Sequence, residues 1–256
     1  MRLSNRFGLV IFSLGFVVLL VSCNTKAEIP YVPPYEQIED PLDDNNDEND
    51  IPPQSYKLLS LGDSYTIGQN VCETCRFPAQ LRDSLAFNFN PQDDFDLNII
   101  AQTGWTTTNL KSAIGAANPS PDQDLVTLLI GVNNQYQGRP FSLYENEFIE
   151  LVNTAIALVG GEASKLIVVS IPDYAYTPFG QNSNPEIISQ ELEQYNQYAQ
   201  NYCDNNGISY VYITDITQQG LNNPALVASD NLHPSELAYS LFVERILPLA
   251  IEKLEQ

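Results

Sequence analysis

The chain has 256 residues, 43% of them hydrophobic, and carries 32 acidic side chains, 11 basic side chains and a single histidine. Its formal net charge of −21 argues against nucleic acid as a partner and against docking on anionic lipids through protein charge, because both contacts depend on Lys and Arg. The hydrophobic fraction is large enough for a sizeable core, which excludes a chain that is disordered throughout.

The first 23 residues have the pattern of a secretory signal. Arg2 and Arg6 supply positive charge, and residues 7–21 form a nearly continuous apolar run that is too short for a comfortable membrane span. The run ends in Leu-Val-Ser-Cys, which resembles a bacterial lipobox. The resemblance implies that Cys23 is lipidated and anchors the protein in the cell envelope, facing outside the cytoplasm. The alternative is an ordinary signal peptide that happens to contain a cysteine.

Residues 24–54 have the composition of an acidic, proline-rich linker. They contain nine acidic side chains, one lysine and six prolines, and residues 43–50 include no apolar side chain. Such a stretch cannot bury enough apolar surface to order itself. We expect a disordered tether that holds a domain off a membrane, or a tail that only aids solubility.

The remaining residues, 55–256, carry 8 basic and 23 acidic side chains, so their net charge is 8 − 23 = −15. Their number suits one domain of ordinary size. Short apolar runs predict strands at residues 56–61, 97–101, 124–130, 165–171 and 208–214. Helical patterns cover residues 77–87, 106–116, 143–159, 185–203 and 235–254.

This alternation predicts an α/β fold with a parallel sheet that is covered by helices on both faces. Ligands in such folds bind at the carboxyl ends of the strands. Pro248 is expected to kink or end the last helix, because proline cannot donate the backbone hydrogen bond of a helix interior.

Two segments at strand ends carry side chains suited to nucleophilic catalysis. After the first strand, the sequence Gly-Asp-Ser places Ser64 on a tight turn, where helix-start amides can stabilise negative charge. After the fifth strand comes His233, the only histidine, three residues after Asp230. Asp230 can accept from one imidazole nitrogen and leave the other for the proton of Ser64. Each segment alone is weak evidence, and together they favour catalysis.

Acyl transfer also needs donors for the negative charge that develops on the carbonyl oxygen. Gly104 follows the second strand, and a glycine lets a backbone N–H approach a substrate closely. Asn133 follows the third strand and brings a side-chain amide. Each of these two residues, considered alone, is explained at least as well by a turn as by a role in catalysis. Trp105, beside Gly104, either lines an acyl pocket or covers the edge of the sheet.

The set Gly62-Asp63-Ser64, Gly104, Asn133 and Asp230…His233 resembles the four motifs of the SGNH (GDSL) hydrolase family, in family order. The resemblance covers roughly residues 57–248. It implies a flavodoxin-like three-layer α/β/α sandwich with a five-stranded parallel sheet, and serine esterase chemistry.

The resemblance also implies a role for each matching residue. Ser64 is the expected nucleophile, His233 the general base and then the general acid, and Asp230 the group that orients His233. The expected oxyanion hole consists of the Ser64 N–H, the Gly104 N–H and the Asn133 side chain. One departure is Asn134, where the family commonly has an Asp. This change should keep the Asn133 donor and bears on how the loop is held.

Cys72 and Cys75 follow the nucleophile turn in the sequence Cys-Glu-Thr-Cys. In an exported protein the simplest interpretation is a small disulfide that staples the loop beside the site, and a redox motif is the alternative. Zinc is disfavoured because Cys203 is the only other cysteine of the domain and the only histidine is already engaged.

The sequence therefore predicts an anchored serine esterase that cleaves carboxylic esters of small molecules, glycans or lipids through an acyl-enzyme. This chemistry requires no metal and no organic cofactor. A thioesterase or a glycan deacetylase would use the same catalytic residues. The remaining alternative is a non-catalytic surface-binding lipoprotein that keeps the fold, and the presence of Ser64, Asp230 and His233 together weighs against it.

Overall fold

A computed structural model describes residues 52–255, so the predicted signal (1–23) and residues 24–51 of the predicted linker lie outside the described residues. Five parallel strands form one sheet in the order β2-β1-β3-β4-β5. This is the flavodoxin-like order. The strands are β1 (Ser55–Gly62), β2 (Asp94–Ala101), β3 (Leu125–Leu129), β4 (Leu166–Val169) and β5 (Ser209–Val211).

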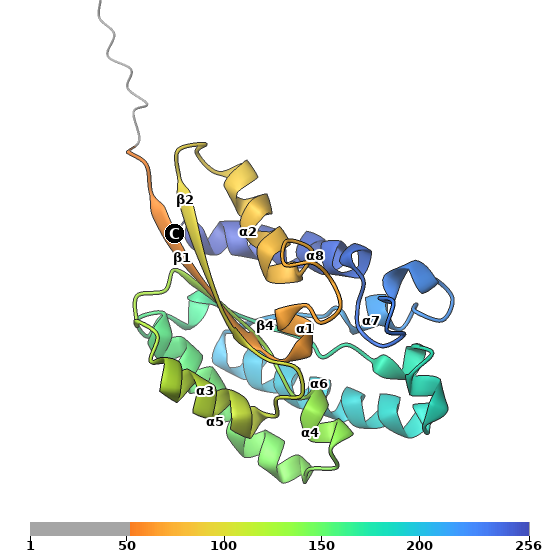
Figure 1. Ribbon diagram of the computed structural model, residues 1–256. Coiled ribbons are helices and arrows are strands. Elements are labelled where there is room, and N and C mark those ends of the chain that lie inside the picture. The colour runs from red at the N-terminus through yellow and green to blue at the C-terminus, as the bar shows by residue number, and fades with distance from the viewer. Residues whose placement is uncertain (1–51, 256) are drawn as a thin grey trace, which may run out of the picture. The chain divides into compact units, whose positions relative to one another are not determined.

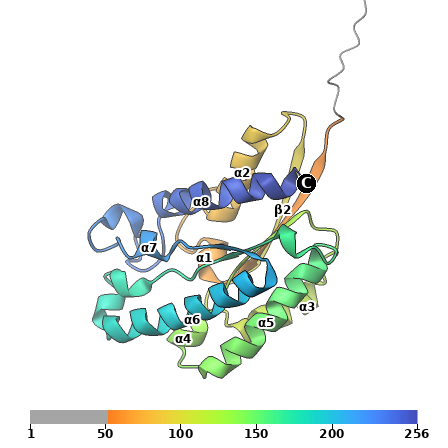
Figure 2. The same cartoon turned by 180° about the vertical axis from the view of Figure 1, so that it is seen from behind.

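Helices cover both faces of the sheet. The long ones are α2 (Phe77–Asn88), α3 (Thr107–Ala117), α5 (Phe141–Leu158), α6 (Pro185–Asn206) and α8 (Glu236–Leu254). Helices α2 and α8 lie on one face and α3, α5 and α6 on the other (Figure 1). Figure 2 shows the same three layers from behind. The predicted α/β/α sandwich is therefore confirmed.

Short helices follow the carboxyl ends of several strands. They are α1 (Ser64–Ile67), α4 (Val132–Tyr136) and α7 (Thr214–Thr217), together with four 3₁₀ turns, η1 (Ala163–Lys165), η2 (Tyr174–Tyr176), η3 (Gly180–Asn182) and η4 (Pro224–Leu226). Apart from the helix start expected at Ser64, none of them was predicted, because such short helices cannot show the helical repeat of apolar residues.

The core lies on both faces of the central strands. Every residue of β3 and β4 is buried, which matches the continuous apolar runs that predicted them. Fully burying one such aliphatic side chain contributes roughly 1.5–3 kcal/mol. An aromatic cluster joins α5 to α6, with the ring centroids of Tyr144 and Tyr195 4.4 Å apart. These contacts make the sheet a rigid base for the loops at its carboxyl edge.

Several predicted bounds differ from the observed ones by up to three residues: strand β5 ends at Val211 rather than at residue 214, and helix α6 ends at Asn206 rather than at residue 203. Strand β2 begins at Asp94 rather than at residue 97, because exposed Asp94 and Asp96 alternate with buried Phe95 on an edge strand. Helix α8 reaches Leu254, as its apolar pattern predicted, so Pro248 does not end it. Ile246 and Ala250 are fully buried on either side of the proline, so packing outweighs the one backbone hydrogen bond that is lost.

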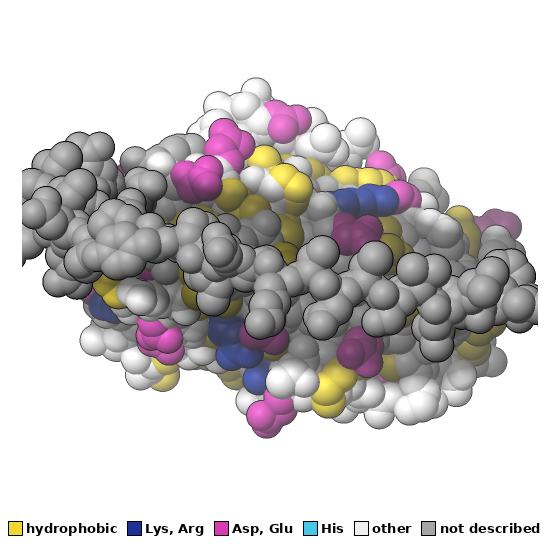
Figure 3. Space-filling model, turned by 90° about the horizontal axis from the view of Figure 1, so that it is seen from above, with side chains coloured by type: hydrophobic (Ala, Val, Ile, Leu, Met, Phe, Trp, Pro, Cys, Tyr) yellow, Lys and Arg dark blue, Asp and Glu magenta, His cyan; other side chains and the backbone are white. Residues whose placement is uncertain are grey.

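The surface carries the acidic excess of the sequence. Figure 3 shows acidic side chains scattered over the face seen from above, with few basic side chains among them. Exposed ion pairs such as Lys57–Asp122 contribute little to stability. Within residues 52–255, no helix combines the length and the apolar content that a membrane span needs.

One buried asparagine holds the end of β4 in place. The Asn196 carboxamide accepts from the Ile171 N–H at 2.7 Å and donates to the Ile171 carbonyl and the Thr214 hydroxyl, both at 3.1 Å. Ile171 leads from β4 into the segment that carries Tyr174. Because this bonding fixes the backbone where it leaves the sheet, it also fixes one wall of the pocket described next.

Candidate active site

The nucleophile turn is built where β1 ends. A Cβ atom on Gly62 would lie 2.1 Å from the Thr66 hydroxyl oxygen and 2.4 Å from the Leu129 carbonyl oxygen, so only glycine fits there. Asp63 caps α1, and its carboxylate accepts from the Tyr65 N–H at 3.0 Å. Ser64 is the first residue of α1 and lies largely buried at the carboxyl edge of the sheet.

Asp63 is a fully buried acid beside the proposed nucleophile. Its second carboxylate oxygen, Oδ2, has no hydrogen-bond partner among the described residues. The nearby Asn133 amide donates to the Trp105 carbonyl instead, at 3.0 Å. Burial raises the pKa of Asp63 to about 7, although the Tyr65 N–H and the Asn133 amide act to lower it. The fold therefore disfavours the ionised form of this side chain.

Asp230 and His233 form a tight pair behind the pocket. The distance between Asp230 Oδ2 and His233 Nδ1 is 2.6 Å, and Asp230 Oδ1 accepts from the backbone N–H groups of Leu232 and His233, both at 3.0 Å. Burial acts to raise the pKa of Asp230, but these hydrogen bonds, led by the one from the His233 ring, hold it below its ordinary value. An ionised Asp230 orients the ring and leaves Nε2 free.

One cavity of about 310 Å³ brings the predicted groups together. Ser64, Gly104, Asn133 and His233 all line it. Within the described range, no hydrogen bond joins the Ser64 hydroxyl to His233. Nucleophile–base hydrogen bonds often tighten only when substrate is bound. Asp230 does not line the cavity but contacts the His233 ring.

The predicted oxyanion donors stand on two loops that are joined by hydrogen bonds. Gly104 has a φ of 84°, in the left-handed region that favours glycine. The Gln137 side chain donates to the Gly104 carbonyl at 3.0 Å, just as Asn133 donates to the Trp105 carbonyl. Trp105 does not line the cavity but packs, half-buried, against the core. This favours the second interpretation of Trp105, as a cover for the sheet.

Sequence reasoning missed the aromatic side of the cavity. Tyr136 of α4 lies opposite Tyr174 and Phe179, with ring centroids 6.1 Å and 6.3 Å away. The Tyr174 hydroxyl donates to the Gln135 side chain at 2.9 Å. Tyr136 remains 57% exposed, so one face of its ring is open to a ligand. No periodic pattern marks these residues in the sequence, because they lie on short turns rather than on long elements.

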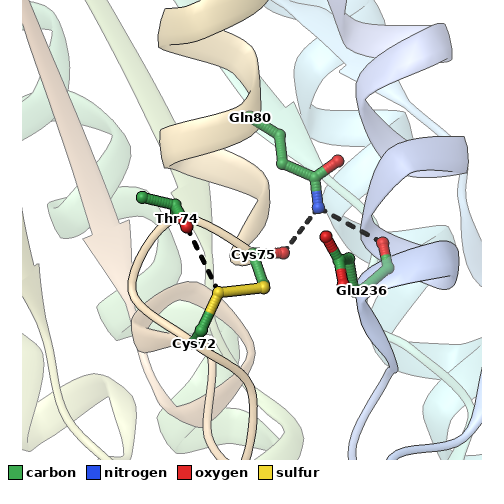
Figure 4. The surroundings of a disulfide bond; sticks show 5 residues. All are labelled: Cys72, Thr74, Cys75, Gln80 and Glu236. Atoms are coloured by element: carbon green, nitrogen blue, oxygen red, sulfur yellow. Dashed lines mark hydrogen bonds between the residues drawn. A yellow bond between two sulfur atoms is a disulfide. The ribbon is translucent and has the colours of Figure 1, made fainter.

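The structure pairs Cys72 with Cys75 in a disulfide. Figure 4 shows how Gln80 of α2 joins this loop to the start of α8, because its amide donates to the Cys75 carbonyl at 2.5 Å and to the Glu236 carbonyl at 3.2 Å. On the other side of the loop, the Asn70 side chain lies 2.8 Å from the Ser229 hydroxyl, and with its amide oxygen turned inward it accepts from the Asp230 N–H at 3.1 Å. The segment around the disulfide thus contacts Asp230 through Asn70 and the start of α8 through Gln80.

The other groups that could bind metal or react are less favourably placed. Cys203 is a free thiol buried in α6, and burial raises its pKa to about 12, so it stays protonated and unreactive at neutral pH. Across residues 52–255, no three His, Cys, Asp or Glu side chains are grouped so that they could hold a metal ion.

The buried carboxyl of Asp63 predicts a pH dependence of stability. Its folded pKa of about 7 lies above the ordinary value of 3.8, so ionisation costs more in the folded than in the unfolded chain. This contribution to the free energy of unfolding falls as pH rises from about 4 to about 7 and is fully lost above that range. Asp63→Asn cannot ionise, so its stability relative to wild type should be higher at pH 8 than at pH 5 in urea unfolding.

Asp215→Asn is the matched control. The hydrogen bond from Arg245 lowers the pKa of Asp215 below 3.8, so that side chain is ionised in both states at pH 5 and above. Its stability relative to wild type should stay constant between pH 5 and pH 8. A constant difference for Asp63→Asn as well would contradict the raised pKa.

Comparisons with known proteins agree with this geometry. Residues 60–241 match the model of the GDSL-like lipase/acylhydrolase family. Comparison with curated proteins gives no match to this chain.

Several solved structures have a similar fold. The acetylxylan esterase Axe2 from Geobacillus stearothermophilus is 21% identical, with a TM-score of 0.57 over 76% of this chain and 94% of that one. A lipolytic G-D-S-L family protein from Veillonella parvula is 16% identical, with a TM-score of 0.58 over 75% and 97%. The psychrotrophic esterase EstA from Pseudoalteromonas sp. is 16% identical, with a TM-score of 0.55 over 78% and 99%. Because the family model matches most of the sequence, the chain belongs to the GDSL-like lipase/acylhydrolase family, whose members are hydrolases of ester bonds.

Proposed function

We propose that this protein is a serine esterase that cleaves carboxylic esters through an acyl-enzyme on Ser64. The observation that carries the proposal is that Ser64 and His233 line one cavity while Asp230 holds the His233 ring at 2.6 Å. A non-catalytic binding protein has no need of this arrangement. Membership of an acylhydrolase family supports the same reaction class.

In the proposed reaction, the Ser64 oxygen attacks the ester carbonyl carbon and its proton passes to Nε2 of His233. The carbonyl oxygen becomes negative and is met by the N–H groups of Ser64 and Gly104 and the Asn133 amide. The C–O bond to the alcohol then breaks, and the alcohol leaves with the proton from His233. Water attacks the acyl-enzyme, gives its proton to His233, and the acid is released as Ser64 regains its hydrogen.

The cavity lining disfavours an anionic ester. Among the described residues no Lys or Arg lines the cavity, and the ionised Asp230 lies behind His233. The aromatic side formed by Tyr136, Tyr174 and Phe179 can pack on a sugar ring, an acyl chain or another flat group. Small-molecule, glycan and lipid esters all remain candidates. A thioesterase or a glycan deacetylase with the same catalytic residues is the second candidate class.

The lipid anchor remains part of the proposal. The apolar run that ends at Ser22-Cys23, followed by a polar, proline-rich segment, supports a lipidated Cys23 and a place in the cell envelope. An anchored enzyme of this kind would meet ester substrates outside the cytoplasm.

Hydrolysis of a p-nitrophenyl ester series, from acetyl to long acyl chains, tests the proposed reaction. Wild type should turn over at least one ester, and Ser64→Ala should lose about a thousandfold or more in kcat, because the nucleophile is gone. The matched control is Ser112→Ala, an exposed serine on α3, which should retain wild-type rates. Equal rates from wild type and a folded Ser64→Ala variant would sink the esterase and favour a binding protein.

Opening the Cys72–Cys75 loop should slow the reaction. The double variant Cys72→Ser/Cys75→Ser frees the loop that follows Asn70, which contacts Asp230, and that Gln80 ties to the start of α8. We expect kcat to fall roughly three- to tenfold with little change in KM, because misplaced catalytic groups slow chemistry more than binding. Dithiothreitol should slow wild type to the same extent and leave the double variant unaffected. Unchanged kcat in the folded variant would contradict the role given to this loop.

Fractionation of a bacterial host that processes lipoproteins tests the anchor. The full chain should enter the membrane fraction and be released by detergent, whereas Cys23→Ala should not, because it offers no thiol for lipid attachment. The variant that lacks Cys72 and Cys75 should stay with the membrane and shows that the effect is specific to Cys23. Wild type that leaves the membrane without detergent would contradict the lipoprotein proposal.

A further inference from the structure

Three buried side chains link the two loops that carry the proposed oxyanion donors. Asn134 of α4 and Thr107 of α3 are fully buried, and Glu147 of α5 is only 7% exposed. Asn134 directly follows Asn133, and Thr107 lies three residues after Gly104. The set therefore spans the two loops and anchors both to a long helix of the core.

The chemistry of the groups fixes the direction of the hydrogen bonds among them. Asn134 Oδ1 accepts from the Thr107 N–H at 2.9 Å, and Asn134 Nδ2 donates to the Thr107 hydroxyl at 2.7 Å. The Thr107 hydroxyl then donates its own proton to Glu147 Oε2 at 2.5 Å. The reverse amide orientation would set an NH₂ group against the Thr107 N–H. The chain therefore runs from amide to hydroxyl to carboxylate.

Glu147 is held as the acceptor at the end of this chain. It also accepts from the Thr108 hydroxyl at 2.8 Å, and the Lys111 ammonium lies 3.4 Å from its other oxygen. With these donors the buried carboxylate is well satisfied, so it can accept the Thr107 proton without a further partner.

We infer that the Asn134–Thr107–Glu147 chain positions Gly104 and Asn133 relative to each other, and that Asn134 and Glu147 act as a matched amide–carboxylate pair. The kinetic part of this inference rests on the proposed esterase function. The bonds from Asn133 to Trp105 and from Gln137 to Gly104 connect the same two loops. The oxyanion donors thus share one bonded unit, and Asn134 is a positioning residue rather than a catalytic one.

The substitution Asn134→Asp should break this hydrogen-bond chain. At a pH where it is ionised, an Asp at this position can still accept from the Thr107 N–H but has no hydrogen to give to the Thr107 hydroxyl. That hydroxyl has one proton and would face two carboxylates, so two oxygen atoms would be left 2.7 Å apart without a proton between them. The resulting repulsion separates the two loops.

The test is a set of four variants assayed on the p-nitrophenyl ester that wild type cleaves fastest. Asn134→Asp should lose about tenfold or more in kcat with KM changed little, because displaced oxyanion donors act on the transition state. Glu147→Gln should lose at most a few-fold, since its carbonyl oxygen can still accept from Thr107.

The double variant Asn134→Asp/Glu147→Gln should recover to within about threefold of wild type. In this variant the side-chain NH₂ at position 147 donates to the Thr107 hydroxyl, and that hydroxyl donates to the carboxylate at position 134. The chain of hydrogen bonds then runs in the opposite direction, and each group has a partner. Asn134→Asp/Glu150→Gln is the matched control. It removes the same negative charge beside Lys111, on an exposed side chain that does not touch Thr107, and should not recover.

Rates are taken per folded protein, with thermal unfolding of each variant measured alongside. Unchanged kcat in Asn134→Asp, or equal recovery by the Glu147→Gln and Glu150→Gln double variants, would overturn the inference. A lower Tm with unchanged kcat would do so too, because it shows a structural role alone. Failure of the Asn134→Asp variant to fold would not end the test. In that case the inference is supported if adding Glu147→Gln restores folding and activity while adding Glu150→Gln does not. Any other pattern overturns it.

A second readout separates this inference from the proposed function. The backbone amide of Gly104 and the side-chain amide of Asn133 give distinct signals in ¹⁵N NMR spectra. Both should shift in Asn134→Asp and return in the Asn134→Asp/Glu147→Gln variant, whether or not the protein cleaves esters. If wild type is inactive, the proposed function fails and these two signals decide the inference alone. Signals that shift in Asn134→Asp and return in the double variant support it. Signals that do not shift in Asn134→Asp overturn it.

Discussion

The register of the three adjacent strands β2, β1 and β3 is the constraint on which the site depends. Ala101, Gly62 and Leu129 lie in one row across the sheet, paired through Gly62. Ser64 follows this row by two residues, Gly104 by three and Asn133 by four. Because parallel strands all end at the same edge, the three proposed oxyanion donors emerge side by side. A slip of one residue would turn every side chain of a strand to the other face and dismantle the row.

The same constraint explains why so much could be predicted from the sequence. Buried parallel strands appear as apolar runs, and whatever follows such a run lies at the carboxyl edge, so the grouping of Ser64, Gly104 and His233 needed no knowledge of packing. Helix α6 was equally predictable from its apolar residues at helical spacing, and its start at Pro185 was predicted correctly. Strand β2 was less so, because an edge strand tolerates the charges of Asp94 and Asp96, and they break the apolar run.

What the sequence could not predict depends on contacts between distant residues. Thr107 is 27 residues from Asn134 and 40 from Glu147, and only the packing of α3, α4 and α5 brings them within hydrogen-bond distance. Phe179 reaches the cavity from a turn whose path is set by bonds such as that from its N–H to the Asn231 carbonyl, at 3.0 Å. Pro248 shows the converse, because a strong local signal was overridden by burial on either side of it.

The two aspartates of the site show how burial and hydrogen bonding divide their charges. Asp230 is partly buried but receives three hydrogen bonds, and its pKa falls, whereas fully buried Asp63 receives fewer and its pKa rises to about 7. In the proposed reaction a negative Asp230 stabilises the protonated His233 ring. A negative Asp63, next to Ser64, would instead oppose the charge that develops on the carbonyl oxygen. Burial of Asp63, with no donor to its Oδ2 among the described residues, thus disfavours a negative charge on the side where the proposed reaction would form the oxyanion, whereas the bonds to Asp230 favour one on the side where it would form the imidazolium.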